Sequence, residues 1–142
     1  MSEFNEKMAH IAEDAVDYAR KLKKELDYSE ASIKDIEAIC TLLYNDIPRG
    51  LFKKLLRKPP PEDMFVQMST MLGAYVGEVM RRHYGGDWSI EDVLGSGKTI
   101  VITIGELKTF PPAKIYKRLK NGPEDSIDSY YHVMTKDQER KF

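Results

Sequence analysis

Apolar residues recur at three- and four-residue spacing through most of the chain, and residues 62–88 hold the longest such pattern. Its large apolar side chains would cover more than a third of a helical wheel; they are Met64, Phe65, Met68, Met71, Leu72, Tyr75, Val76, Val79 and Met80. Gly85 and Gly86 follow, and a glycine after the last periodic residue is typical of a helix end. The pattern predicts a long central helix that ends in a Gly-Gly turn before Trp88.

Two glycines lie one turn apart inside this helix, Gly73 and Gly77, and each costs roughly 1 kcal/mol of helix stability relative to alanine. We expect them to allow close approach of another backbone or an aromatic ring. The neighbouring Glu78 precedes Arg81 and Arg82 by three and four residues, a spacing that favours an ion pair on the helix surface. The alternative is a half-buried carboxylate that serves binding or acid–base chemistry, with Glu78, Arg82 and Trp88 as candidate site residues.

Two amphipathic helical patterns and a basic segment precede the central helix. Residues 4–27 and 32–46 each place apolar residues on one stripe, and Ser32 suits a helix start. The short DYSEAS connection between them favours an antiparallel hairpin of helices. Residues 48–61 then combine leucine with a basic patch, Lys53, Lys54, Arg57 and Lys58. This short helix is either a surface for phosphate or anionic membrane, or a solvated face beside an acidic neighbour.

The period changes from helical to alternating after Trp88. Ile100, Ile102 and Ile104 alternate with smaller residues, which predicts a strand over residues 99–104 whose isoleucine face lies on the long helix. A weaker strand begins at Trp88, and a short one covers residues 107–110. The segment therefore predicts a three-stranded antiparallel meander.

Prolines and glycine delimit the last helical segments. Pro111-Pro112 open a helix that Asn121-Gly122 close, with an outer face that is basic at Lys114, Lys117, Arg118 and Lys120. Pro123 starts a final helix that carries Tyr130 and Tyr131, which either line a pocket or stack on a base, or belong to the core. Residues 135–142 are predicted to fray.

These elements predict one α+β domain over residues 1–142. It contains an N-terminal helical hairpin, a long central helix packed on a small three-stranded antiparallel sheet, and C-terminal helices. A chain of 142 residues can bury a sizeable core. Its net charge of −1 provides no global field for nucleic acid, and no run approaches the roughly 20 apolar residues of a membrane helix. The polar, acidic start predicts a cytoplasmic protein, and the single cysteine, Cys40, excludes an internal disulfide.

Local motifs for catalysis or metal binding are weak. The run GSGKT at residues 95–99 lacks the earlier glycine of a phosphate-binding loop and is followed by a predicted strand. His10, His83 and His132 have no second ligand at metal-binding spacing. We therefore predict no metal and no cofactor, and we assign no catalytic residue.

The run LGAYVGEVMRRHYGGDW (72–88), the short sheet after it, and TFPPAKIYKRLKNGPEDSIDSYY (109–131) resemble an uncharacterised bacterial family, the DUF3806-like group. In that group a G-E helix ends in a G-G-x-W turn, and a short sheet leads to a proline-started helix. The resemblance covers the C-terminal half. It implies a small soluble bacterial domain without established activity, in which Gly77, Glu78, Gly86 and Trp88 match as fold or site positions.

Three functional hypotheses follow. The first is a non-enzymatic protein that binds another protein, as an immunity protein, an antitoxin or an adaptor does, because the chain is rich in charge and shows no assembled nucleophile. The second is a small-ligand or enzymatic pocket between the central helix and the sheet, built from Glu78, Arg82, Trp88, Tyr130 and Tyr131. The third, nucleic-acid binding through the basic patches, is disfavoured by the net charge.

Overall fold

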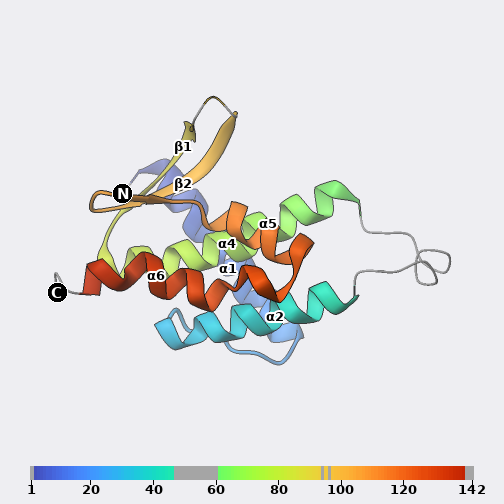
Figure 1. Cartoon of the computed structure of the whole chain (residues 1–142). Helices are drawn as coiled ribbons and strands as arrows, with labels where there is room; N and C mark the ends of the chain where they lie inside the picture. The colour runs from blue at the N-terminus through green and yellow to red at the C-terminus, as the bar shows by residue number, and fades with distance from the viewer. Residues whose placement is uncertain (1, 47–60, 94, 96, 140–142) are drawn as a thin grey trace.

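The computed structural model describes residues 2–46, 61–93, 95 and 97–139 (Figure 1). The helices and strands are, in chain order, α1 (Glu3–Lys21), the 3-10 turn η1 (Glu30–Ser32), α2 (Ile33–Asp46), α4 (Glu62–Tyr84), β1 (Asp87–Asp92), β2 (Lys98–Ile104), β3 (Leu107–Thr109), α5 (Pro111–Asn121), the 3-10 turn η2 (Pro123–Asp125) and α6 (Ile127–Glu139). The predicted α+β class is therefore confirmed. The basic segment with Lys53, Lys54, Arg57 and Lys58 lies outside the described residues.

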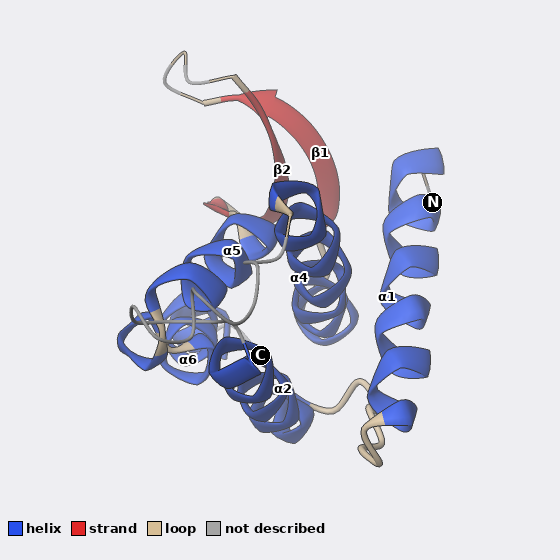
Figure 2. Cartoon of the chain, turned by 90° about the vertical axis from the view of Figure 1, so that its right-hand side faces the viewer, coloured by secondary structure: helices blue, strands red, loops and turns tan. Residues whose placement is uncertain are grey.

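Helix α4 is the centre of the molecule, as its apolar pattern predicts. It packs against α1 on one side and α5 on the other, as Figure 2 shows. Its residues from Leu72 to Met80 are all buried, so this part of the helix contacts protein all round. The helix begins at Glu62 after Pro61 and ends before Gly85, whose φ of +79° is readily adopted only by glycine. Both boundaries agree with the sequence pattern.

The two glycines of α4 lie at the closest contacts of the helix. A Cβ atom at Gly73 would lie 2.4 Å from Cα of Pro112, at the start of α5. A Cβ atom at Gly77 would lie 2.1 Å from Cη2 of Trp88, at the start of β1. We predicted that these glycines allow another backbone or an aromatic ring to approach the helix closely. The prediction is confirmed at both positions, with a backbone at Gly73 and an aromatic ring at Gly77.

The sheet is an antiparallel meander in the order β1-β2-β3, also as predicted. Trp88 pairs with Ile102, and Ile102 pairs in turn with Thr109. Ile102 and Ile104 are fully buried because β2 packs on both α4 and α5. The far end of the β1–β2 hairpin projects beyond the helices (Figure 1), and Ile90 there is half exposed.

The N-terminal half differs from the expected helical hairpin. Helix α1 ends at Lys21 rather than near residue 27, because Lys23 and Tyr28 both take positive φ angles that no α-helix accommodates. Helix α1 then packs mainly on α4, whereas α2 packs mainly on α5 and α6. An apolar stripe shows that a helix buries one face, but it does not say which neighbour covers that face. The short connection was therefore a poor guide to pairing.

Two further expectations can be compared with the structure. Cys40 is fully buried, as predicted, and burial raises the pKa of its thiol to about 12. The predicted fraying from residue 135 is wrong for residues 135–139, because α6 continues to Glu139 with Thr135 and Gln138 buried. Within the described part of the chain, no helix combines the length and the apolar character needed to cross a membrane.

Candidate functional site

Glu78 is fully buried in α4 and is surrounded by hydrogen-bond donors. Arg81 donates from Nε to Oε2 at 2.7 Å and from Nη2 to Oε1 at 3.0 Å. The indole N–H of Trp88 donates to Oε2 at 2.8 Å. The predicted partner Arg81 is therefore correct, but the predicted location on the helix surface is wrong. Trp88 covers Gly77 and closes this side of the carboxylate from water.

The Glu78 cluster continues into the first helix through a buried amide. The side-chain oxygen of Asn5 accepts a hydrogen bond from the backbone N–H of Trp88 at 2.7 Å, and its N–H donates to Asp87 at 2.9 Å. Asn5 is 2% exposed. The cluster thus joins α1, α4 and β1, and its polar atoms are used within the protein. This geometry is that of a structural link between three elements.

The other residues predicted for the site are only partly gathered there. Arg82 lies at the edge of the cluster, 3.8 Å from Glu78 Oε1, with its guanidinium 3.5 Å above the ring of Tyr28. Tyr131 lies in the core and donates its hydroxyl to Glu30 instead. Tyr130, next to Tyr131 in sequence, lies at a third place, beside Thr109. The structure therefore does not assemble Glu78, Arg82, Trp88, Tyr130 and Tyr131 into one site.

Glu30 accepts two tyrosine hydroxyls on the same carboxylate oxygen. Tyr84 from α4 and Tyr131 from α6 each donate to Oε2 at 2.6 Å. Burial alone would raise the pKa of Glu30, but these two hydrogen bonds outweigh it and hold that pKa below its usual value. Glu30 thus fastens η1 to two helices that are distant in sequence.

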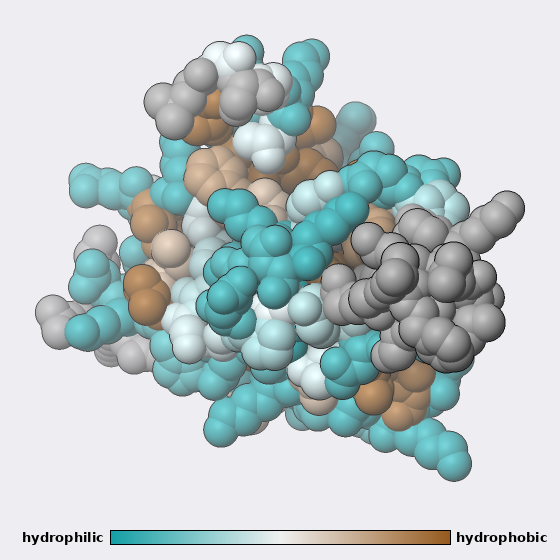
Figure 3. Space-filling view, turned by 45° about the vertical axis from the view of Figure 1, so that its right-hand side comes forward, coloured by the Kyte–Doolittle hydropathy of each residue, from teal (hydrophilic) through white to brown (hydrophobic). Residues whose placement is uncertain are grey.

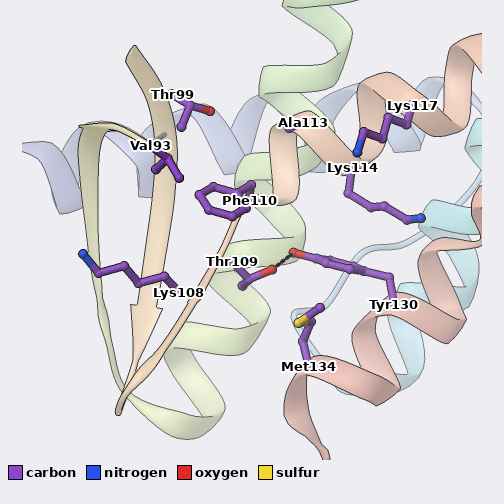
Figure 4. Close-up of a pocket in the computed structure, with 10 residues that line it drawn as sticks. All are labelled: Val93, Thr99, Lys108, Thr109, Phe110, Ala113, Lys114, Lys117, Tyr130 and Met134. Atoms are coloured by element: carbon purple, nitrogen blue, oxygen red, sulfur yellow. Dashed lines mark hydrogen bonds between the residues drawn. The ribbon is translucent and has the colours of Figure 1, made fainter. Parts of the chain in front are cut away.

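Tyr130 lines an open pocket of about 350 Å³ between the sheet, α5 and α6 (Figure 4). Apolar atoms make up most of its surface. The lining residues are Val93, Thr99, Lys108, Thr109, Phe110, Ala113, Lys114, Lys117, Tyr130 and Met134. Pockets of this size, with apolar walls and a few polar groups, are typical sites for small molecules.

The floor of the pocket carries the Phe110 ring and the hydroxyl pair of Thr109 and Tyr130. Figure 4 shows Phe110 in the middle, with Thr109, Tyr130 and Met134 beside it. Thr109 Oγ1 and the Tyr130 hydroxyl lie 2.5 Å apart and form a hydrogen bond. Burial raises the pKa of Tyr130, and hydrogen bonds from Thr109 and the Phe110 backbone act in the opposite direction without reversing it. The phenol is therefore protonated at neutral pH.

The lysines of the pocket differ in their partners. Lys108 contacts Glu91 at 2.6 Å, and Lys114 contacts Asp125 at 3.2 Å. Lys117 is exposed and makes no hydrogen bond or ion pair with a described residue. Among the three pocket lysines, Lys117 is therefore the one for which the described residues supply no ion-pair partner.

The prediction that α5 has a basic outer face needs a correction, because most of its cations are paired or buried within the chain. Arg118 is 1% exposed rather than on the outside, and it donates to Glu37 at 2.6 Å and to Thr41 at 2.7 Å. Lys120 contacts Glu62 at 2.8 Å. Because three of the four cations are paired or buried, α5 presents little net positive surface.

Sequence reasoning missed this pocket because its lining comes from four separate stretches of the chain, at residues 93, 99, 108–117 and 130–134. The usable signal was local: Phe110 stands directly before the Pro111 helix start, and Lys114 and Lys117 lie three residues apart on that helix. The polar pair Thr109–Tyr130 spans 21 residues, which no spacing rule connects.

The described residues contain no group of three or more His, Cys, Asp and Glu side chains that would hold a metal ion. Comparison of the chain with family models gives no match, and comparisons with curated proteins and with solved structures find no similar protein. The function is therefore argued from the geometry of the pocket.

Proposed function

We propose that this protein binds a small organic molecule in the pocket between the sheet, α5 and α6. The observation that carries the proposal is the combination of an apolar floor, formed by Phe110, Ala113 and Met134, with the protonated hydroxyl pair of Thr109 and Tyr130. Apolar walls supply affinity and a few placed hydroxyls supply orientation in such sites. The proposal replaces the pocket expected around Glu78, because the Glu78 carboxylate is buried and accepts hydrogen bonds from Arg81 and Trp88.

The described part of the face drawn in Figure 3 favours binding of a small molecule over binding of another protein. Figure 3 shows hydrophilic residues over much of the face it presents, with one larger group of apolar residues in its upper part and smaller groups elsewhere. Stable protein interfaces usually centre on a contiguous apolar or aromatic patch. Several charged side chains that sequence analysis left free for a partner, including Lys114 and Lys120, are paired within the chain.

A neutral aromatic dye, N-phenylnaphthylamine, tests the pocket directly, because its fluorescence rises in apolar surroundings. We expect saturable binding to the wild-type protein. Met134→Trp fills the pocket from α6 and should weaken binding about tenfold, which corresponds to about 1.4 kcal/mol. Val133→Trp is the matched control: it introduces the same ring one residue earlier, at a position that is 68% exposed, and should bind like the wild type.

A second obstruction makes the test independent of how well Met134→Trp folds. Ala113→Leu narrows the pocket from α5 and should also weaken dye binding, while thermal unfolding checks that each variant is folded. Absence of saturable dye binding by the wild type would refute the proposed site. Dye binding as tight as that of the wild type in both Met134→Trp and Ala113→Leu would also refute it.

A further inference from the structure

We infer that the ligand of this pocket is a small organic acid, an aromatic or branched apolar body with one negatively charged group, and that Lys117 recognises the charge. The inference rests on the proposed function and specifies its ligand class. It follows from the charges around the pocket and from where the lysine side chains point.

The described residues of the lining are basic and include no carboxylate. Three lysines line the pocket, and two of them, Lys108 and Lys114, are neutralised by Glu91 and Asp125. Three positive charges against these two carboxylates leave one net positive charge. Asp125 also feels the charge of Lys117, but its oxygens are engaged by the side chains of Lys114 and Asn121. A cationic ligand would therefore be repelled, and an anion would be attracted.

The lysine side chains point in different directions. In Figure 4 the Lys117 ammonium turns back along α5 toward Ala113, whereas the Lys108 ammonium lies on the far side of the pocket, beyond the strands. The Lys114 ammonium reaches away toward its partner at 3.2 Å. Within the described lining, Lys117 thus places an ammonium group without an ion-pair partner at the α5 edge of an apolar floor.

The start of α5 adds to the same potential. The pocket includes Phe110 and Ala113, which flank the Pro111-Pro112 pair that opens the helix. Aligned peptide dipoles make a helix N-terminus favourable for negative charge. An acid group beside Lys117 and an apolar body on Phe110 and Met134 together match the polarity of the pocket from edge to floor.

Two dyes that differ by one charge test the inference. Anilinonaphthalenesulfonate is N-phenylnaphthylamine with an added sulfonate, so the pair separates apolar binding from anion recognition. We expect the sulfonate to bind the wild type about fivefold or more tightly than the neutral dye, as one partly screened charged contact would give. That advantage should shrink as sodium chloride is raised, while binding of the neutral dye stays constant.

Lys117→Gln should remove the advantage of the sulfonate and leave the neutral dye unaffected, and Lys117→Arg should restore it. Lys136→Gln, the same charge change at an exposed position of α6 outside the pocket lining, should behave like the wild type.

If neither dye binds, the proposed function fails, and this inference fails with it. If the neutral dye binds but the sulfonate gains nothing, or keeps its gain in Lys117→Gln, the inference alone is refuted. Equal displacement of the sulfonate by inorganic phosphate and by benzoate would also overturn it, because an apolar body would then contribute nothing.

Discussion

A fully buried carboxylate depends on the donors around it, since no water compensates for a donor that is lost. Glu78 receives three N–H groups, two from Arg81 and one from Trp88. An amide in its place would carry no negative charge and would direct N–H groups at other N–H groups. The charge of Glu78 therefore contributes to stability, which an ion pair on an exposed helix surface would hardly do.

We predict that Glu78→Gln destabilises the protein by about 2–4 kcal/mol, because it leaves the Arg81 charge without its buried partner. Urea unfolding followed by the fluorescence of Trp88, the single tryptophan of the chain, measures the change. Glu106→Gln serves as the control, because Glu106 is exposed between β2 and β3. A loss below about 0.5 kcal/mol in Glu78→Gln would mean that the cluster contributes no more than a surface pair.

Residue spacing predicted the partner of Glu78 but not its burial. The three-residue interval to Arg81 is visible in the sequence, whereas the carboxylate is covered by Trp88, whose backbone N–H is bonded to Asn5 across 83 residues. Arg118 shows the same limit. Its position on a basic helix resembles a surface cation, and only the approach of α2 brings Glu37 and Thr41 to it.

At the scale of elements, α6 is capped by a residue from another helix. Oε1 of Glu37, in α2, accepts the backbone N–H groups of Ile127 at 2.9 Å and Asp128 at 3.3 Å, together with the hydroxyl of Ser126 at 2.8 Å. Its second oxygen accepts Nε of Arg118 from α5. One carboxylate thus joins three helices and satisfies donors at a helix N-terminus that would otherwise be unpaired.

We predict that Glu37→Gln destabilises the protein by about 2 kcal/mol, because the charge-assisted hydrogen bonds to the α6 terminus and to Arg118 are weakened. Glu124→Gln is the matched control: Glu124 is an exposed carboxylate in η2, a few residues before the same helix. Chemical denaturation at neutral pH compares the two variants. Equal stability of both would show that α6 does not depend on this cap.

Among the elements, those with local signals were predicted well. Glycine and proline marked the ends of α4 and α5, and alternation marked β2, because these signals act within a few residues. The predicted pairing of α1 with α2 was wrong, because helices with similar apolar stripes can exchange partners without any change in local pattern. The pocket was missed for a related reason, since β3, α5 and α6 each contribute only part of it.

At the scale of the whole molecule, several carboxylates are stabilised in the charged form by folding. They are Asp27, Glu30, Glu37, Glu62, Glu91 and Asp125. Hydrogen bonds hold the pKa of each carboxyl below its ordinary value. For Glu30 and Glu37 these hydrogen bonds outweigh burial, which acts to raise the pKa. The unfolded chain therefore binds protons at a higher pH than the folded chain. The stability that these groups contribute is fully present above their pKa values in the unfolded chain, near 4.5 for glutamate. It is lost as the pH falls through their lower pKa values in the folded chain.

We predict that the free energy of unfolding is nearly constant from about pH 7 to pH 5 and falls steadily from about pH 5 toward pH 3. Urea unfolding at a series of pH values gives this curve. In Glu37→Gln the decline should be shallower, because one of the contributing carboxylates is absent. A stability that rose on acidification would contradict these assignments.

The position of α1 also has a consequence for synthesis of the protein. This helix leaves the ribosome well before α4, yet the residues that cover its apolar face belong mainly to α4, and Asn5 is bonded to Asp87 and Trp88. More than half of the 142 residues must therefore be translated before α1 can dock. Until then Met8, Ala12 and Ala15, which are fully buried in the finished protein, face solvent on the nascent chain. At elongation rates of about 5–20 residues per second this interval lasts several seconds, long enough for a chaperone to bind the exposed helix.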